Sequence, residues 1–219
     1  MARRTYDQYC PIAISLDVIG DRWAPLVIRE LLLGPRRYTD LARGLPGIAT
    51  DMLTRRLREL EEAGVVTRRQ LPPPAATPVY ELTERGERLR QPLIGLARWG
   101  LELMPAPADD LEFTPTMLAN ALQAVLRPGP RDRLELALVI GGEEFAVHVR
   151  AGSARVERGR PDSPELTLRG EPPALVAAVT GDDPRPADVE LEGDAAALDR
   201  LRSWVTLPGQ AAAAAAQLS

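Results

Sequence analysis

Two threonines, an aspartate and two arginines recur within a short segment, at a spacing that places them on one side of a helix: Thr50, Asp51, Thr54, Arg55 and Arg58. A guanidinium group can bond a guanine edge through two donors, and it can also hold a phosphate. The pattern therefore predicts an exposed helix whose polar side reads a nucleic-acid groove. The alternative interpretation is an ordinary solvated helix face.

The opposite side of this segment is apolar, which fixes how the predicted helix would sit. Leu53, Leu57 and Leu60 recur at i, i+4 and i+7 and so form one buried stripe. Three glutamates gather at residues 59–62 and would repel DNA. Only the N-terminal part of the helix is then expected to enter a groove, as in helix-turn-helix recognition helices.

A second pair of cations, Arg68 and Arg69, stands on a predicted strand over residues 65–70. A Pro-rich loop, residues 72–78, joins this strand to another over 79–82. We expect this hairpin to act as a wing whose arginines contact DNA phosphates. Helices are predicted over residues 10–19, 22–33, 38–43 and 50–63, and Thr83 is expected to cap a further helix beginning at Glu84.

The chain has one cysteine, Cys10, and one histidine, His148. This excludes an intrachain disulfide framework and a multi-cysteine metal site, and it leaves no evident nucleophile–base pair. We therefore expect no catalytic residues, no metal, no cofactor and no enzymatic activity. His148 is predicted on a strand, facing away from Phe145, Val147 and Val149.

Composition favours an ordinary globular protein of one large or two small domains, with 219 residues, 45% hydrophobic and 26% charged. No apolar run is long enough to span a membrane and no signal-type segment stands at the N-terminus, so a cytoplasmic protein is expected. Residues 1–104 carry 16 Arg against 13 Asp or Glu, whereas the remainder is acidic. A basic half beside an acidic half fits one domain that faces a polyanion and one that does not.

Seven short motifs give the N-terminal half a specific likeness: Cys10-Pro11-Ile12, Ile19-Gly20-Asp21-Arg22-Trp23, Ile28-Arg29-Glu30-Leu31, Leu45-Pro46-Gly47-Ile48, Leu57-Arg58-Glu59-Leu60-Glu61, Tyr80-Glu81-Leu82-Thr83 and Trp99-Gly100. Over about residues 8–104 the chain resembles the HxlR-type winged-helix transcription regulators. The resemblance implies a bacterial homodimer that binds palindromic operator DNA, with an interface built from the first helix and a last helix at about residues 92–104. On that last helix, Leu93, Leu96, Trp99 and Leu103 form the apolar side.

The resemblance also gives Cys10 a role and exposes two departures. Some members of the family sense oxidants or electrophiles through a cysteine in this position, and Cys10 matches it; the alternative is a small packed side chain. Ala49 stands where the family often has Ser or Thr, so Thr50 is expected to cap the helix instead. The wing tip is Pro and Ala rather than basic, which weakens its expected groove contact.

The C-terminal half reads as a small α+β domain. The patterns predict helices over residues 116–126, 172–180 and 194–205, and strands over 133–140, 143–150, 154–157, 165–168 and 189–193, with Gly141-Gly142 as a hairpin turn. This order resembles the sterol-carrier-protein-like fold over about residues 112–206. The resembling pieces are residues 163–170, 175–181 and 191–194 with Ala197-Leu198.

That resemblance implies an apolar cavity between sheet and helices for a lipid-like molecule. The candidate lining residues lie on the inward stripes of the predicted elements: Leu118, Leu122, Leu136, Leu138, Phe145, Val147 and Leu175. The alternative is a structural or oligomerisation domain whose core is filled, because a plain core requires the same leucines.

The expected fold class is thus α+β: a winged helix-turn-helix domain over residues 1–104, a linker over 105–111, a sterol-carrier-like α/β sandwich with an antiparallel-rich sheet over 112–206, and a low-complexity tail over 207–219. The expected function is a homodimeric regulator that binds operator DNA and is modulated by an apolar ligand or by Cys10 oxidation. The rival is a lipid-binding or carrier protein whose winged helix serves protein contacts.

Overall fold

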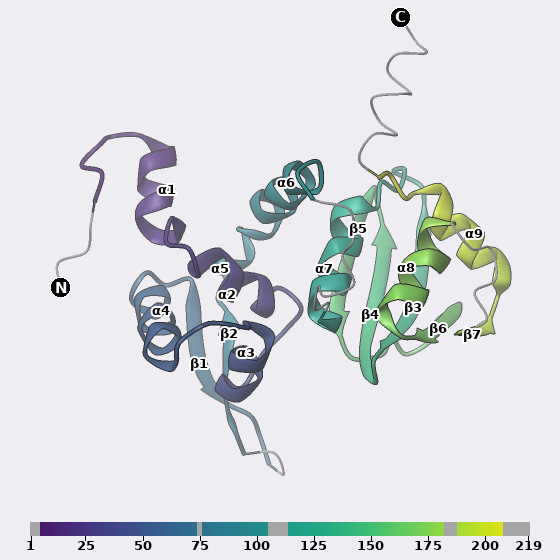
Figure 1. Ribbon diagram of the computed structural model, residues 1–219, viewed down its shortest axis with the longest axis horizontal. Helices are drawn as coiled ribbons and strands as arrows, with labels where there is room; N and C mark the ends of the chain where they lie inside the picture. The colour runs from purple at the N-terminus through teal and green to yellow at the C-terminus, as the bar shows by residue number, and fades with distance from the viewer. Residues whose placement is uncertain (1–4, 74–75, 105–113, 182–187, 208–219) are drawn as a thin grey trace, which may run out of the picture. The chain divides into compact units, whose positions relative to one another are not determined.

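The computed structural model describes residues 5–73, 76–104, 114–181 and 188–207. Its chain divides into two compact units, Met1–Leu93 and Ile94–Ser219 (Figure 1). The predicted linker, residues 105–111, lies outside the described residues, and so does the predicted tail apart from Leu207. The helix α6, Arg90–Leu101, begins in the first unit and continues in the second.

The first unit is helical and carries one hairpin. Its elements are α1 (Pro11–Ile19), α2 (Ala24–Leu31), α3 (Tyr38–Gly44), α4 (Thr50–Glu62), β1 (Val66–Gln70), β2 (Pro78–Leu82) and α5 (Glu84–Glu87). The strands pair in antiparallel fashion, with Arg68 opposite Tyr80. A further antiparallel bridge joins Arg36 to Tyr80, so the segment before α3 extends the hairpin. The order α1 to α4 followed by the β1–β2 hairpin confirms the winged helix-turn-helix arrangement.

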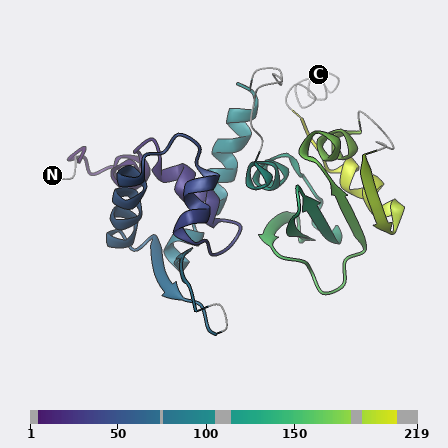
Figure 2. The ribbon, with the colours of Figure 1, turned by 60° about the horizontal axis from the view of Figure 1, so that its bottom comes forward.

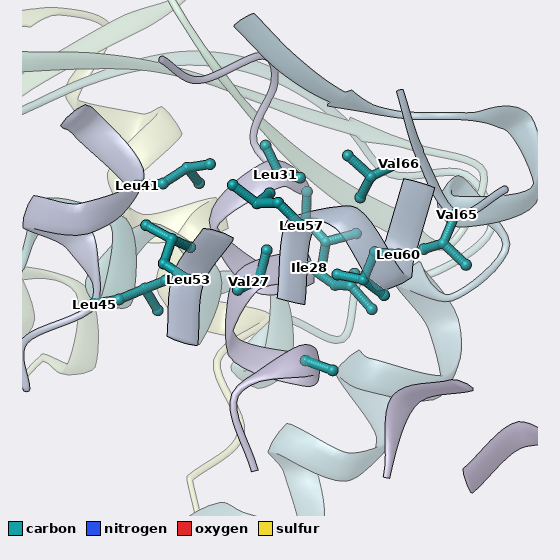
Figure 3. Close-up of a cluster of buried hydrophobic side chains, with 12 residues drawn as sticks. Val27, Ile28, Leu31, Leu41, Leu45, Leu53, Leu57, Leu60, Val65 and Val66 are labelled. Carbon is teal, nitrogen blue, oxygen red and sulfur yellow. The ribbon is translucent and has the colours of Figure 1, made fainter. Parts of the chain in front are cut away.

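The core of this unit forms between α2, α3, α4 and the start of β1 (Figure 3). Leu53, Leu57 and Leu60 of α4 are fully buried there, as their spacing predicts. Leu93 packs against the same cluster from α6. Buried apolar area of this kind is the main source of stability in such a unit.

Several helix boundaries differ from the sequence prediction. The helix predicted over 22–33 spans Ala24–Leu31, because residues 21–23 form a turn in which the Ala24 amide donates to the Asp21 carbonyl. The N-cap is Trp23, and the Asp21 carboxylate accepts from the Trp23 amide at 3.3 Å. The helix predicted over 92–104 spans Arg90–Leu101. Its start is fixed by the Arg90 guanidinium, which is buried and donates to the Leu32 carbonyl at 2.6 Å.

The second unit is a mixed sheet covered by helices. After α6 come α7 (Pro115–Val125), β3 (Arg133–Ile140), β4 (Glu143–Arg150), β5 (Ser153–Arg158), β6 (Leu166–Gly170), α8 (Pro172–Thr180), β7 (Val189–Gly193) and α9 (Ala195–Ser203). The strand order is β5-β4-β3-β6-β7. Among the strands that the structure describes, only β3 and β6 pair in parallel, because the chain between β5 and β6 crosses the sheet.

All three helices α7, α8 and α9 gather on one face of this sheet (Figure 2). Gly141 and Gly142 both take positive φ values, 54° and 85°, which a tight hairpin of this hand requires. The opposite face carries polar side chains from β3 and β4, among them Glu135 and His148, which lie opposite each other in the register. His148 thus faces away from Phe145, Val147 and Val149, as predicted, and those three side chains are buried.

Candidate nucleic-acid interface

The polar side of α4 is exposed along its whole N-terminal half. Leu53, Leu57 and Leu60 turn toward the core (Figure 3). The five candidates singled out from the sequence all lie on the solvent side, and all are exposed: Thr50, Asp51, Thr54, Arg55 and Arg58. The structure thus gathers on one helical surface the hydroxyl and guanidinium groups that spacing alone suggested.

The first turn of α4 is held by a tyrosine of α3. The Tyr38 hydroxyl donates to the Thr50 carbonyl at 2.9 Å and lies 3.1 Å from the Thr54 hydroxyl. The Thr54 hydroxyl itself donates to the Thr50 carbonyl at 2.9 Å. Its proton is therefore already engaged inside the protein.

The predicted cap at Thr50 is wrong. The N-cap residue is Ala49, and its side chain makes no capping bond. Because alanine cannot accept from the first amides of the helix, the anchoring of this end comes from Tyr38.

The arginines of α4 differ in what they contact. The Arg58 Nε donates to the Glu62 carboxylate at 2.9 Å, and this bond raises the pKa of Arg58 further above its already high ordinary value. Arg55 contacts the Met52 sulfur at 3.0 Å and has no carboxylate partner in the part of the chain that is described. Arg55 is accordingly the guanidinium of α4 that is most available to an incoming phosphate or base, whereas Arg58 must first part from Glu62.

The hairpin separates Arg68 from Arg69. Successive residues of a strand point to opposite faces, so the two guanidiniums do not act together. Arg69 pairs with Glu81 at 2.7 Å. Arg68 lies over the Tyr80 ring, 5.9 Å from its centroid. Burial raises the pKa of Tyr80, Arg68 opposes part of that rise, and the phenol stays neutral at physiological pH. Of the wing tip, residues 74 and 75 lie outside the description.

Sequence reasoning missed Arg37 and Tyr38. Arg36 and Arg37 are neighbours that differ in exposure. The Arg36 side chain is nearly buried against Glu30. Arg37 is exposed and has no ion pair within residues 5–73 and the other described segments. The available signal was a pair of arginines directly after Gly34-Pro35 and before a helix. Tyr38 and its contacts on α4 are more than ten residues apart in the sequence, so no local pattern indicates this contact.

A buried carboxylate ties these elements together. Glu30 of α2 is fully buried and pairs with Arg29 at 2.9 Å and with Arg36 at 3.2 Å. A methyl group at Gly44 would lie only 2.3 Å from a Glu30 carboxylate oxygen, so the end of α3 closes over the cluster. Glu30 thus fixes α2, α3 and the segment leading into it.

Two surfaces bear on assembly. On and before α1, apolar side chains are exposed, among them Tyr9, Ile12 and Ile14. On α6 and just after it, Leu96, Trp99, Leu103 and Met104 are also exposed. Cys10 is half-buried at the N-cap of α1 and makes no capping bond with its side chain.

The cavity candidates of the second unit lie on the helix-covered face of the sheet or on its helices. Six of them are buried, whereas Leu118 is only half-buried. A groove of about 440 Å³ opens on the other face, between β3 and β4 and the segment crossing from β5 to β6, and none of the seven candidates lines it. Its residues are mostly charged, including Glu135, His148 and Arg160. No cluster of three metal-binding side chains occurs among the described residues.

Comparison with known proteins places the first unit. Residues 18–107 match the HxlR-like helix-turn-helix family. The uncharacterized HTH-type transcriptional regulator YkvN of Bacillus subtilis strain 168 is 40% identical over 94 residues, which are 42% of this chain and 77% of YkvN. The chain belongs to the HxlR-like helix-turn-helix family.

Other relatives match this HxlR-like protein over a similar share of its chain. The uncharacterized HTH-type transcriptional regulator sll1512 of a Synechocystis strain is 40% identical over 42% of this chain and 67% of its own length. Among solved structures, the reduced form of the transcriptional regulator YodB from B. subtilis is 33% identical, with a TM-score of 0.39 over 47% of this chain and 100% of that chain. Among the described residues, no helix is long and apolar enough to cross a membrane.

Proposed function

We propose that this HxlR-like regulator binds double-stranded operator DNA through the N-terminal half of α4 and through Arg68 of the hairpin. The observation that carries the proposal is the exposed polar stripe of α4, which combines two threonines with a guanidinium free of carboxylates at Arg55. A helix of this kind fits the major groove, and arginine is the side chain that most often reads guanine there.

The charges along α4 support an oblique approach. Glu59, Glu61 and Glu62 stand at its C-terminal end, where they would meet phosphates unfavourably. The N-terminal residues Thr50, Asp51, Thr54 and Arg55 would face the base edges, and Arg58 would reach the backbone after leaving Glu62. Arg69, held by Glu81, would contribute less than Arg68.

The DNA-binding unit would act as a homodimer on a palindromic site. A two-fold dimer presents its recognition helices to half-sites about one helical turn apart. Support comes from the exposed apolar side chains of α1 and α6, since monomeric proteins rarely leave such groups in contact with water in number. We assign residues 1–104 to DNA binding and dimerisation.

For residues 112–206 we propose a sterol-carrier-like domain that takes an apolar molecule on the helix-covered side of its sheet. The order helix, three strands, strand, helix, strand, helix agrees with that proposal. Operator affinity would change when the ligand binds or when Cys10 is oxidised. Cys10→Ser would abolish the response to oxidation. A filled core with a structural role is the alternative for this domain.

The test begins with genomic fragments retained by the purified protein, followed by affinity measurements on the enriched sequence. Arg55→Ala should weaken specific binding by about 1–3 kcal/mol, as expected for a lost base contact. Arg68→Ala should weaken all sequences about equally and flatten the salt dependence, as expected for a lost phosphate contact.

The matched control is Arg133→Ala, which removes an exposed guanidinium from β3 in the second unit. Its affinity should equal that of the wild type. Wild-type affinity in both Arg55→Ala and Arg68→Ala would show that the interface has been placed on the wrong surface.

A further inference from the structure

Arg56 differs from the other arginines of α4 because it lies outside the exposed stripe. Its side chain is only 12% exposed, and one guanidinium nitrogen lies 2.8 Å from the Asp21 carboxylate. The other terminal nitrogen contacts Glu59, one turn further along the same helix. Both terminal nitrogens of the Arg56 guanidinium are thus paired, and Asp21 is the partner outside α4.

Asp21 belongs to the turn between α1 and α2. Its main-chain carbonyl accepts from the Ala24 amide at 3.0 Å, and its second carboxylate oxygen accepts from the Trp23 amide at 3.3 Å. The preceding residue, Gly20, ends α1 by donating to the Leu16 carbonyl at 2.8 Å. The carboxylate that holds Arg56 is therefore itself held by the start of α2 and follows directly on the end of α1.

The pair adds a polar link to the apolar packing of α4. The leucine stripe allows small sliding and rotation of a helix, because contacts between apolar side chains are not directional. A charge-assisted hydrogen bond between partly buried groups is directional and short. At the first turn, the Tyr38 hydroxyl gives α4 a neutral hydrogen bond to α3, whereas Arg56 gives it a charge-assisted bond to the α1–α2 turn.

We propose that Arg56 is a positioning residue of the recognition helix: its pair with Asp21 holds α4 against the turn between α1 and α2 in the orientation that binds DNA. This inference rests on the proposed function and adds to it a link between α1 and the groove-facing surface. Arg56 itself would touch neither base nor phosphate.

The sign of the effect of Asp21→Asn separates positioning from simple electrostatics. Removing a carboxylate from a DNA-binding unit strengthens DNA binding when only long-range charge matters. If the carboxylate positions α4, Asp21→Asn instead weakens specific binding, by roughly tenfold, within the range of energies by which contacting residues couple. The control is Glu59→Gln, which removes the other carboxylate bound to Arg56 but lies on α4 itself; it should bind as tightly as the wild type or more tightly.

A double-mutant cycle completes the test. Arg56→Gln should weaken specific binding as Asp21→Asn does, and the double variant should bind about as well as the weaker single variant, since the link can be broken only once. Circular dichroism at the assay temperature checks that each variant is folded. Wild-type or tighter binding by Asp21→Asn, or losses that simply add in the double variant, would overturn the proposal.

Hydrogen exchange gives a reading that needs no DNA. Amides of α4 should exchange faster in Asp21→Asn than in the wild type, while those in the middle of α2 keep their protection. Unchanged exchange along α4 would contradict the positioning role. If Asp21→Asn exchanges faster along α4 but the wild-type protein retains no genomic fragment, the proposed DNA binding is wrong and the link between Asp21 and Arg56 stands.

Discussion

At the scale of single residues, Glu30 is the acidic side chain on which the geometry of the first unit depends. It is fully buried, and both of its arginine partners are largely shielded from water. Forming such a pair contributes little net stability, because both groups lose hydration, but removing one partner leaves uncompensated charge in a poorly solvated place. The cluster therefore matters most when it is broken.

Glu30→Ala should destabilise the protein by about 3–5 kcal/mol, since it removes the buried carboxylate that balances the charges of Arg29 and Arg36. Chemical denaturation followed by circular dichroism measures the change in the free energy of unfolding. The control is Glu84→Ala, which removes an exposed carboxylate paired with Arg88 and should cost no more than about 1 kcal/mol. Equal effects of the two substitutions would mean that Glu30 is hydrated in solution.

At the scale of elements, the recognition helix depends on contacts that its own sequence does not encode. Tyr38→Phe deletes only the hydroxyl that bonds the Thr50 carbonyl and meets Thr54. We expect the free energy of unfolding to fall by about 0.5–1.5 kcal/mol and the affinity for operator DNA to decrease, because the first turn of α4 loses its hydrogen bond to α3. Denaturation and DNA titration of the same preparation measure both effects. Tyr6→Phe, at an exposed tyrosine before α1, should change neither.

Local pattern predicted the elements wherever a turn residue marks their ends. The strands over 133–140 and 143–150 and the helix over 172–180 have the predicted bounds, because Gly141-Gly142 and the left-handed Gly181 stop them. Prediction failed where a distant contact decides the boundary. The start of α6 at Arg90 depends on such a contact, in which the acceptor is the Leu32 carbonyl.

The candidate site follows the same division. Periodicity was enough to place Thr50, Asp51, Thr54, Arg55 and Arg58 on an exposed surface. It could not rank the arginines, because their availability depends on which carboxylate is near. Arg58 and Glu62 are close enough in sequence to have suggested a pair, whereas the Arg69–Glu81 and Arg56–Asp21 pairs require the fold.

At the scale of the whole molecule, the exposed apolar helices bear on oligomeric state. Ile12→Glu on α1 and Trp99→Glu on α6 should each convert a dimer into monomers, because a charge buried at an apolar interface without a partner is costly. Sedimentation of the full chain measures the mass directly. The control is Val176→Glu, at an exposed apolar residue of α8. A dimer that survives both helix substitutions would place the interface elsewhere.

The second unit raises the question of whether its helix-covered face encloses space or is filled. Leu122 of α7 is one of the cavity candidates, and its side chain is buried. If an apolar molecule binds there, long-chain or aromatic apolar compounds should raise the melting temperature of the full chain, since binding to the native state alone stabilises it by mass action. Leu122→Trp should then abolish the shift at little cost in stability. In a filled core the same substitution should cost about 1–3 kcal/mol through overpacking, and no compound should shift the transition.

Val176→Trp, on the exposed side of α8, controls for the added indole: it should leave both the stability and any ligand-induced shift unchanged. Calorimetry with and without each compound measures the wild type and both variants. Strong destabilisation by Leu122→Trp without any ligand-induced shift would assign this unit a structural role.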